Sequence, residues 1–252
     1  MMISFGRLRL GRLAFLLVVV LLAAPPKHAL AETSASEVEL LDQLVFPGSV
    51  SAVVKWPGAV RFAIAAESDE DAALAVKIIS DIADKIPGRF QDKIIIERRV
   101  PLIDVPALRK RSVIYITSQP YDDLAGPLRP FFETLITNGD DVDQRIAQVR
   151  SLDAPWQTTF GADGKHEVVG VLVMIKASTD LATKRLMLAG AVAQSVCPTL
   201  LLLDSDPGLF ETDGEKMTLS SLGLDLFMLM LGDDVRAGMT KAEFLEIVQR
   251  LH

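Results

Sequence analysis

A histidine and a glutamate ahead of an apolar run, in the segment KHEVVGVLVMIK at residues 165–176, are the residues whose spacing most resembles a catalytic motif. A zinc protease of the HExxH type needs a second histidine four residues after the first, so that both imidazoles reach one metal. That position is Gly170. The flanking residues favour a strand, in which His166 and Glu167 would point to opposite faces. Beyond residue 31 the other histidine is His252, and we expect no metal and no cofactor.

An acidic stretch, DSDPGLFETDGE, is the second candidate for a metal site. Its carboxylates Asp204, Asp206 and Glu215 occupy the first, third and twelfth positions of a calcium-binding loop. Such a loop also needs a side-chain oxygen at its fifth position and a glycine at its sixth, and these are Gly208 and Leu209. We expect a solvated acidic loop, with calcium binding as the alternative.

Nucleophilic chemistry has weak candidates. Cys197 lies in an apolar run, where we expect a buried structural thiol, because reactive thiols need an electropositive and partly exposed setting. Ser195 lies in the same run, and no G-x-S-x-G turn presents a serine. Carboxylate pairs for hydrolysis can be drawn in many ways, and no motif selects one. We lean towards a protein that is not an enzyme.

A basic cluster stands out against an acidic chain whose net charge is −7. We expect its residues to lie in a hairpin between two β-branched runs, KIIIERRV and SVIYIT. One interpretation is a solvated hairpin, and the other is a docking patch for an acidic protein face, an anionic cell-wall polymer or lipid headgroups. The cluster consists of Arg98, Arg99, Arg109, Lys110 and Arg111.

The N-terminus has the features of a secretory signal. Arg7, Arg9 and Arg12 precede an apolar run at residues 13–24, and the sequence ALA follows at 29–31. This run is shorter than the ~20 residues that span a membrane. We therefore predict cleavage after Ala31, export to the periplasm and no stable membrane insertion. The signal carries basic residues and no acidic ones, so the mature chain is more acidic still, which disfavours binding to nucleic acid.

The elements that must position these residues alternate between strands and helices. We expect an α+β fold, in which a mixed β-sheet packs with helices and the C-terminal third is helical, as one domain over residues 32–252. A polar segment at 138–165 is expected to be a linker or an excursion across the surface. Pro120, Pro127 and Pro130 are expected to precede a helix at 131–136. Strands are expected at 60–64, 93–100, 112–117 and 166–178, and helices at 37–46, 68–86, 180–196, 219–231 and 240–251.

Three segments, VVKWPGAVRFAIA, RSVIYITSQPYDDL and the closing GEKMTLSSLGLDLFMLMLGDDVRAGMTKAEFLEIVQRL, together resemble an uncharacterised family of proteobacterial exported proteins and lipoproteins. The resemblance covers roughly Val53 to Leu251. Its most specific part is the GMTKAE box with Asp225 in the preceding helix. The resemblance implies a fold similar to minimal zincin-like peptidases.

The same resemblance places an active-site slot in the stretch LMLAGAVAQSVCPTL. Family members carry a cysteine and acidic or metal-binding side chains there, but this chain has Ala189, Gly190, Ala191 and Gln194, followed by Cys197. None of the first four can ligate zinc or act as a general base at neutral pH. The resemblance therefore implies a degenerate catalytic slot.

Together these features favour a non-catalytic periplasmic protein that binds an envelope protein or cell-wall polymer on a degenerate peptidase-like scaffold. The alternative is a divergent carboxylate-dependent peptidase or cell-wall hydrolase. A concave pocket holding two or more of Asp204, Glu211, Asp225 and Asp233 would favour that enzyme, whereas a filled slot beside an exposed apolar groove would favour the binder. A small-ligand sensor subunit is a third hypothesis.

Overall fold

The computed structural model describes residues 29–48, 50–97, 110–135, 142–151, 156–200, 208–213 and 215–251. The chain divides into two units, Met1–Ser36 and Glu37–His252. Helix α1 (Ala29–Val45) begins in the first unit and ends in the second, and the predicted cleavage after Ala31 would remove its first residues. Within the described residues, no helix combines the length and the hydropathy that crossing a bilayer requires.

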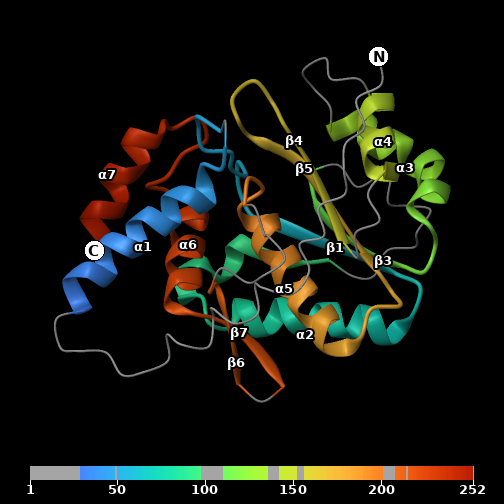
Figure 1. Cartoon of the computed structure of the whole chain (residues 1–252), viewed down its shortest axis with the longest axis horizontal. Coiled ribbons are helices and arrows are strands. Elements are labelled where there is room, and N and C mark those ends of the chain that lie inside the picture. The colour runs from blue at the N-terminus through green and yellow to red at the C-terminus, as the bar shows by residue number, and fades with distance from the viewer. Residues whose placement is uncertain are drawn as a thin grey trace, which may run out of the picture. The chain divides into compact units, whose positions relative to one another are not determined.

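A five-stranded mixed sheet forms the centre of the second unit, which confirms the α+β prediction (Figure 1). The strand order is β2-β1-β3-β5-β4. The first four strands in this order run parallel, and β4 pairs antiparallel with β5 at one edge. The strands are β1 (Val60–Ala66), β2 (Ile94–Ile96), β3 (Ser112–Thr117), β4 (Trp156–Ala162) and β5 (Val168–Lys176).

Helices cover both faces of this sheet, and for that reason β3 is buried along its whole length. Helices α2 (Asp69–Ala83) and α5 (Leu181–Val196) lie on one face, where Phe62 and Ile114 belong to the larger apolar core. Helices α3 (Tyr121–Leu135) and α4 (Val142–Ser151) lie on the opposite face (Figure 1). There, Leu124, Leu128 and Phe132 pack in a smaller core with strand residues such as Tyr115.

Local capping signals fix where several helices begin. The Ser68 hydroxyl accepts a hydrogen bond from the Asp71 amide at the start of α2, and the Asp180 carboxylate does the same for Thr183 at the start of α5. Ahead of α7 (Lys241–Leu251), Thr240 and Glu243 bond reciprocally as a capping box. These starts agree with the sequence. The spacing of Ser68 and Asp71 also predicts a reciprocal capping box, but the Asp71 carboxylate forms an ion pair with Lys184 instead.

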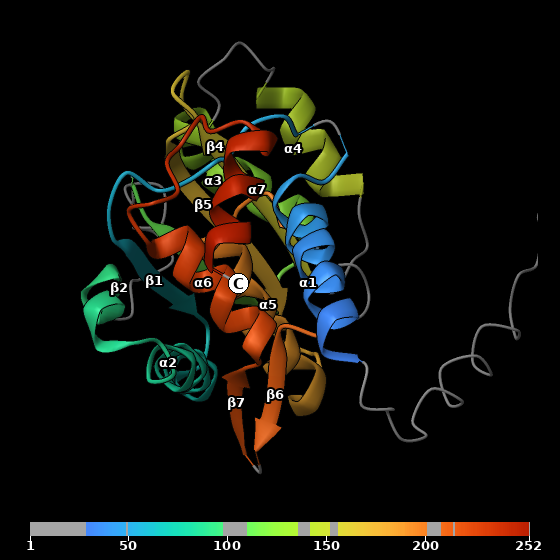
Figure 2. The same cartoon turned by 90° about the vertical axis from the view of Figure 1, so that its left-hand side faces the viewer.

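The C-terminal third is mainly helical, as predicted, and it also contains a two-stranded hairpin. Strands β6 (Phe210–Asp213) and β7 (Lys216–Leu219) pair antiparallel and project beside α5 (Figure 2). Helix α6 (Ser221–Leu231) follows, and Phe244 of α7 packs edge-to-face against Phe46 with ring centroids 5.4 Å apart. Gly223 at the start of α6 lies so close to the Leu209 carbonyl that a Cβ atom would stand 2.1 Å from its oxygen.

Three expectations were wrong. Strands β2 and β3 do not form a hairpin, because β1 lies between them and all three run parallel. Helix α3 includes Pro127 and Pro130, since burial of its apolar stripe outweighs the backbone hydrogen bonds that the prolines remove. The segment 138–165 is neither a linker nor a surface excursion in its described parts, because it supplies α4 and the edge strand β4.

Candidate functional site

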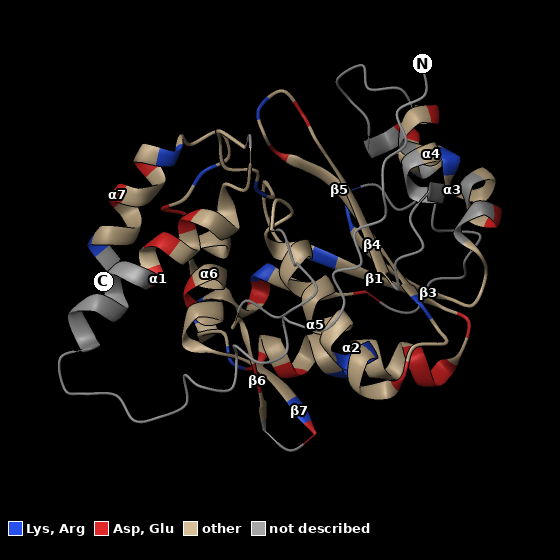
Figure 3. Cartoon of the chain, in the orientation of Figure 1, with Lys and Arg blue, Asp and Glu red and all other residues tan. Residues whose placement is uncertain are grey.

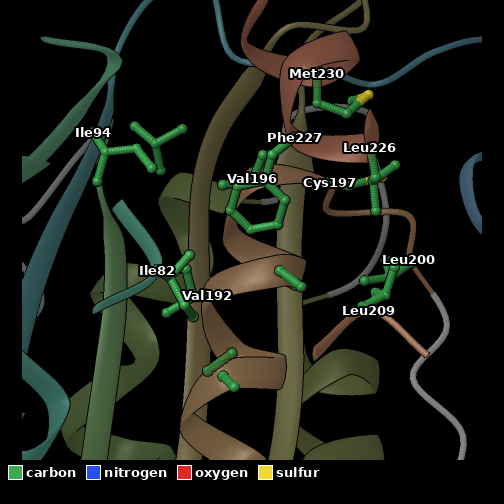
Figure 4. Close-up of a cluster of buried hydrophobic side chains, with 14 of the residues drawn as sticks. Ile82, Ile94, Val192, Val196, Cys197, Leu200, Leu209, Leu226, Phe227 and Met230 are labelled. Carbon is green, nitrogen blue, oxygen red and sulfur yellow. The ribbon is translucent and has the colours of Figure 1, made fainter. Parts of the chain in front are cut away.

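The slot that the family resemblance places on α5 is filled with packed side chains. Ala189, Ala191 and Cys197 have no exposed surface, and Gln194 is 8% exposed. Figure 4 shows Val192 and Val196 of α5 and the following Cys197 beside Phe227, Leu226 and Met230 of α6, with Ile82 of α2 nearby. This stretch of α5 is therefore part of the larger core, and these side chains are shielded from solvent.

Gln194 is held by hydrogen bonds at both ends of its amide. Its Oε1 accepts a short hydrogen bond from the Thr158 hydroxyl on β4, and its Nε2 donates to the Leu200 carbonyl at 3.0 Å. A buried polar group is stable only when it is paired in this way. The amide thus joins the edge strand, α5 and the turn that follows α5.

The next residue, Ser195, continues the same buried polar contacts. Its hydroxyl donates to the Ala191 carbonyl at 2.6 Å and accepts from the Ser112 hydroxyl of β3 at 2.5 Å. The Ser195 carbonyl accepts from the Trp56 indole N–H at 2.6 Å. A hydroxyl bonded back to its own helix and capped by a second hydroxyl is a structural group. We call Gln194, Ser195, Thr158, Ser112 and Trp56 the polar seam.

The Cys197 thiol is buried, as the sequence predicts. Burial raises its pKa to about 11, although its contact with the Thr199 hydroxyl acts in the opposite direction. At neutral pH the group is a neutral thiol, which is a poor nucleophile and a poor metal ligand. Cys197 therefore acts in packing.

His166 lies in the turn between β4 and β5, where its φ angle of 63° is in the left-handed region. Its amide donates to the Asp163 carbonyl, and its carbonyl accepts from the Lys55 amide. Within the described residues, no group of three or more His, Cys, Asp or Glu side chains could hold a metal ion. His166 serves the turn geometry here, while His252 lies outside the described residues.

The basic cluster is described only in part. Arg98, Arg99 and Arg109 lie outside the described residues. Lys110 is exposed, with a φ angle of 58°, while Arg111 forms an ion pair with Glu97 at 2.5 Å. Partner binding through this cluster stays a prediction.

The calcium candidate is also described in part, since Asp204 and Asp206 lie outside the described residues. Glu215 is exposed at the turn of the β6–β7 hairpin. Strand β6 occupies the seventh to tenth positions of the expected loop, whereas a calcium loop wraps around its ion. The described residues thus form a hairpin at this place.

A surface pocket of about 580 Å³ lies beside α6. The 3-10 helix η2 (Gly88–Lys93) contributes Arg89, Phe90 and Lys93 to it. The rest of the lining comes from Asp225, Met228 and Leu229 of α6, from the Gly232, Asp233 and Asp234 turn, and from Val248 of α7. Four of the lining residues are spaced by three or four positions along the chain, so that one side of the α6 segment faces the pocket. They are Asp225, Met228, Leu229 and Gly232. Figure 3 shows how acidic and basic positions are distributed along the chain, and α6 itself carries one acid, Asp225.

The pocket combines side chains of opposite charge with apolar side chains. Lys93 Nζ lies 3.5 Å from the Asp233 carboxylate, whose side chain is 94% exposed. The Arg89 guanidinium lies over the Phe90 ring, 4.7 Å from its centroid. Two of the acids that the sequence analysis named, Asp225 and Asp233, therefore share one concave site.

Lys55 fastens the turn that carries two of these carboxylates. Its Nζ donates a short hydrogen bond to the Gly232 carbonyl and another, at 2.6 Å, to the Val235 carbonyl, which bracket Asp233 and Asp234. Burial lowers the pKa of Lys55 to about 8, opposed by the negative charges of the two aspartates. The ammonium also stabilises the carbonyl end of α6.

Neither protein-family models nor curated proteins nor solved structures give a match to this chain. The family resemblance, and the slot that it implies, therefore stay predictions.

Sequence reasoning missed the η2 side of the pocket and the role of Lys55. It named Asp225 and Asp233 only as members of a set of acids. One signal was available, because the spacing of Asp225, Met228, Leu229 and Gly232 marks a helix stripe that is interrupted by a charge and a glycine.

Proposed function

We propose that this protein is a non-catalytic component of the periplasm that binds another envelope component on a degenerate peptidase-like scaffold. The observation that carries the proposal is the filled slot on α5. Where catalytic side chains are expected, both ends of the Gln194 amide form hydrogen bonds within the protein, and the neighbouring small residues pack into the core. Such side chains stabilise a fold and offer nothing to a substrate.

The proposal is tested first by looking for chemistry. The protein is expressed with its own signal, purified after export and incubated with zinc and either casein or peptidoglycan fragments. We expect no metal-dependent turnover and no stoichiometric zinc by elemental analysis. Turnover that requires zinc and disappears in Gln194→Ala would overturn the proposal.

A second test identifies the partner in cells. A photoreactive amino acid replaces Asp234 at the pocket, and in a matched strain it replaces the exposed Val76 on α2. We expect one envelope component to crosslink at Asp234 and not at Val76. Equal crosslinking at both positions would contradict specific binding at the pocket.

The alternative function is a carboxylate-dependent hydrolase, and the pocket itself is the observation that favours it. Asp225 and Asp233 lie there together, as a pair of carboxylates for general acid and base catalysis would. Hydrolysis of peptide or glycan fragments that persists in EDTA, and is lost in both Asp225→Asn and Asp233→Asn, would establish this enzyme in place of the binder.

A further inference from the structure

The two walls of the pocket beside α6 carry opposite charges. Arg89 and Lys93 come from η2, which we call the η2 wall, and Asp225, Asp233 and Asp234 come from α6 and the turn after it, which we call the α6 wall. Lys93 already pairs with Asp233 at 3.5 Å. Within the described residues, Arg89 forms no ion pair, and its guanidinium is held in place by stacking on Phe90. A ligand that carries one sign of charge would satisfy one wall and be repelled by the other. The walls together are complementary to a ligand that carries both signs.

The apolar part of the lining is adaptable. It consists of Phe90 of η2 and Met228 and Leu229 of α6, which together we call the apolar floor, and methionine fits ligands of varied shape because its side chain is unbranched and polarisable. An apolar floor also lowers the local dielectric constant, which strengthens contacts between charges above it. This combination suits aliphatic stems that end in charged groups.

The acidic wall is fixed before any ligand arrives. Lys55 bonds the carbonyls of Gly232 and Val235 and so holds the Asp233–Asp234 turn at the carbonyl end of α6. The Lys55 ammonium already lies at the negative end of the helix dipole there, so the charge offered to a ligand comes from the aspartate side chains. A site that is ordered in advance loses little entropy on binding.

We propose that this pocket binds a short peptide segment of the partner that carries one basic and one acidic side chain. The basic group lies against Asp225 and Asp234, the acidic group lies against Arg89 beside the Lys93–Asp233 pair, and the stems cross the apolar floor. This inference rests on the proposed function in one respect, that the peptide is bound and not cleaved. At about 580 Å³, the pocket accommodates a few side chains and not a folded domain.

The test uses end-capped peptides, so that side chains alone carry charge. Isothermal titration with the exported protein compares a series in which lysine and glutamate are separated by zero to three leucines. In matched peptides, norleucine replaces lysine, glutamine replaces glutamate, or both are replaced. At the best spacing we expect the doubly charged peptide to bind about tenfold more tightly than either singly charged one. Its affinity should fall as salt is added.

Pocket variants assign each charge to its wall. Asp225→Asn is expected to weaken the lysine-containing peptides about tenfold and leave the glutamate-only peptide unchanged. Arg89→Gln is expected to have the opposite selectivity. Asp234→Asn, in an exposed turn, repeats the first test if Asp225→Asn does not fold. The matched control is Glu70→Gln, an exposed acid in the first turn of α2, which should change no affinity.

Equal affinity for the charged and uncharged peptides, or affinity that none of the pocket variants changes, would refute the assignment. Its failure differs from failure of the proposed function. If the doubly charged peptide is cleaved and Asp225→Asn abolishes cleavage, the pocket assignment stands and the non-catalytic function falls. If no peptide binds but a partner crosslinks elsewhere on the protein, the assignment falls and the proposed function stands.

Discussion

Replacing Gln194 with methionine removes the amide from the polar seam while keeping the length of the side chain. The Leu200 carbonyl then loses its donor in a buried place, which costs about 1–3 kcal/mol. The Thr158 hydroxyl also loses its acceptor, but it is half-buried and can turn to water. Allowing for the apolar surface that methionine buries, we expect the free energy of unfolding to fall by about 2 kcal/mol. That is roughly a thirty-fold change in the folding equilibrium.

Replacing the same residue with glutamate tests whether this side chain is buried, because a buried carboxyl makes the stability depend on pH. Burial disfavours the ionised carboxylate, so the pKa of this carboxyl in the folded state lies above its ordinary value of about 4.3. While protonated, the carboxyl can donate to the Leu200 carbonyl as the amide does. Stability is therefore close to that of the parent below pH of about 4 and is lost as pH rises through the folded-state pKa.

Urea denaturation followed by tryptophan fluorescence measures both effects, because Trp56 bonds directly to the Ser195 carbonyl and reports on α5. With an m-value of about 2 kcal/mol/M, Gln194→Met should lower the midpoint by about 1 M. Ala182→Met, at an exposed position of the same helix, is the control and should change the free energy of unfolding by less than about 0.5 kcal/mol. A Gln194→Glu protein that is as stable as its parent at both pH 4 and pH 8 would show that this slot is open to solvent.

Three further predictions concern other groups. Asp71→Asn leaves the Lys184 ammonium buried without its carboxylate, so calorimetry should show that the free energy of unfolding falls by about 3 kcal/mol. The control, Glu133→Gln, removes an exposed ion pair and should lower it by about 0.5 kcal/mol. Equal losses in the two variants would contradict the burial argument. Because burial raises the pKa of Cys197 to about 11, the thiol should not react with Ellman's reagent at pH 8 until urea unfolds the protein, and rapid labelling of the native state would show that it is accessible. Burial lowers the pKa of Lys55 from 10.5 to about 8, so between these pH values the unfolded chain binds more protons than the folded one. The free energy of unfolding of the parent, relative to that of Lys55→Met, should therefore rise with pH across this window. A difference that does not change with pH would refute the prediction.

Helix starts could be predicted from the sequence because their signals are local. Ser68, Asp180 and the Thr240–Glu243 pair each cap the helix that follows, and each needs only neighbours along the chain. The order of the strands is not local. A β-branched run has the same sequence pattern in a hairpin and in a parallel pair of strands. The residues near β2 and β3 therefore gave no sign that β1 lies between them. The completely buried SVIYIT run was the available clue, because a strand covered on both faces is typical of parallel sheets.

The candidate site also has some features that local sequence predicts and others that it does not. The Cys197 environment was predictable, because an apolar run buries a thiol wherever the run packs. The pocket was not predictable, because Arg89, Asp225 and Val248 come from three separate elements and meet only in the folded chain. The two carbonyl groups that Lys55 contacts are also far from it in sequence, and no sequence motif predicts a lysine that donates to backbone oxygens.

The parallel pairing of β1, β3 and β5 also affects how the chain reaches its native state. Phe62 pairs with Ser112, and Ser112 pairs with Val171, so long loops must close before either contact forms. Chains dominated by such non-local contacts fold slowly compared with helical bundles. A slow-folding polypeptide stays unfolded for longer, as passage through a translocation channel requires. The topology therefore suits the export route that the N-terminal sequence predicts.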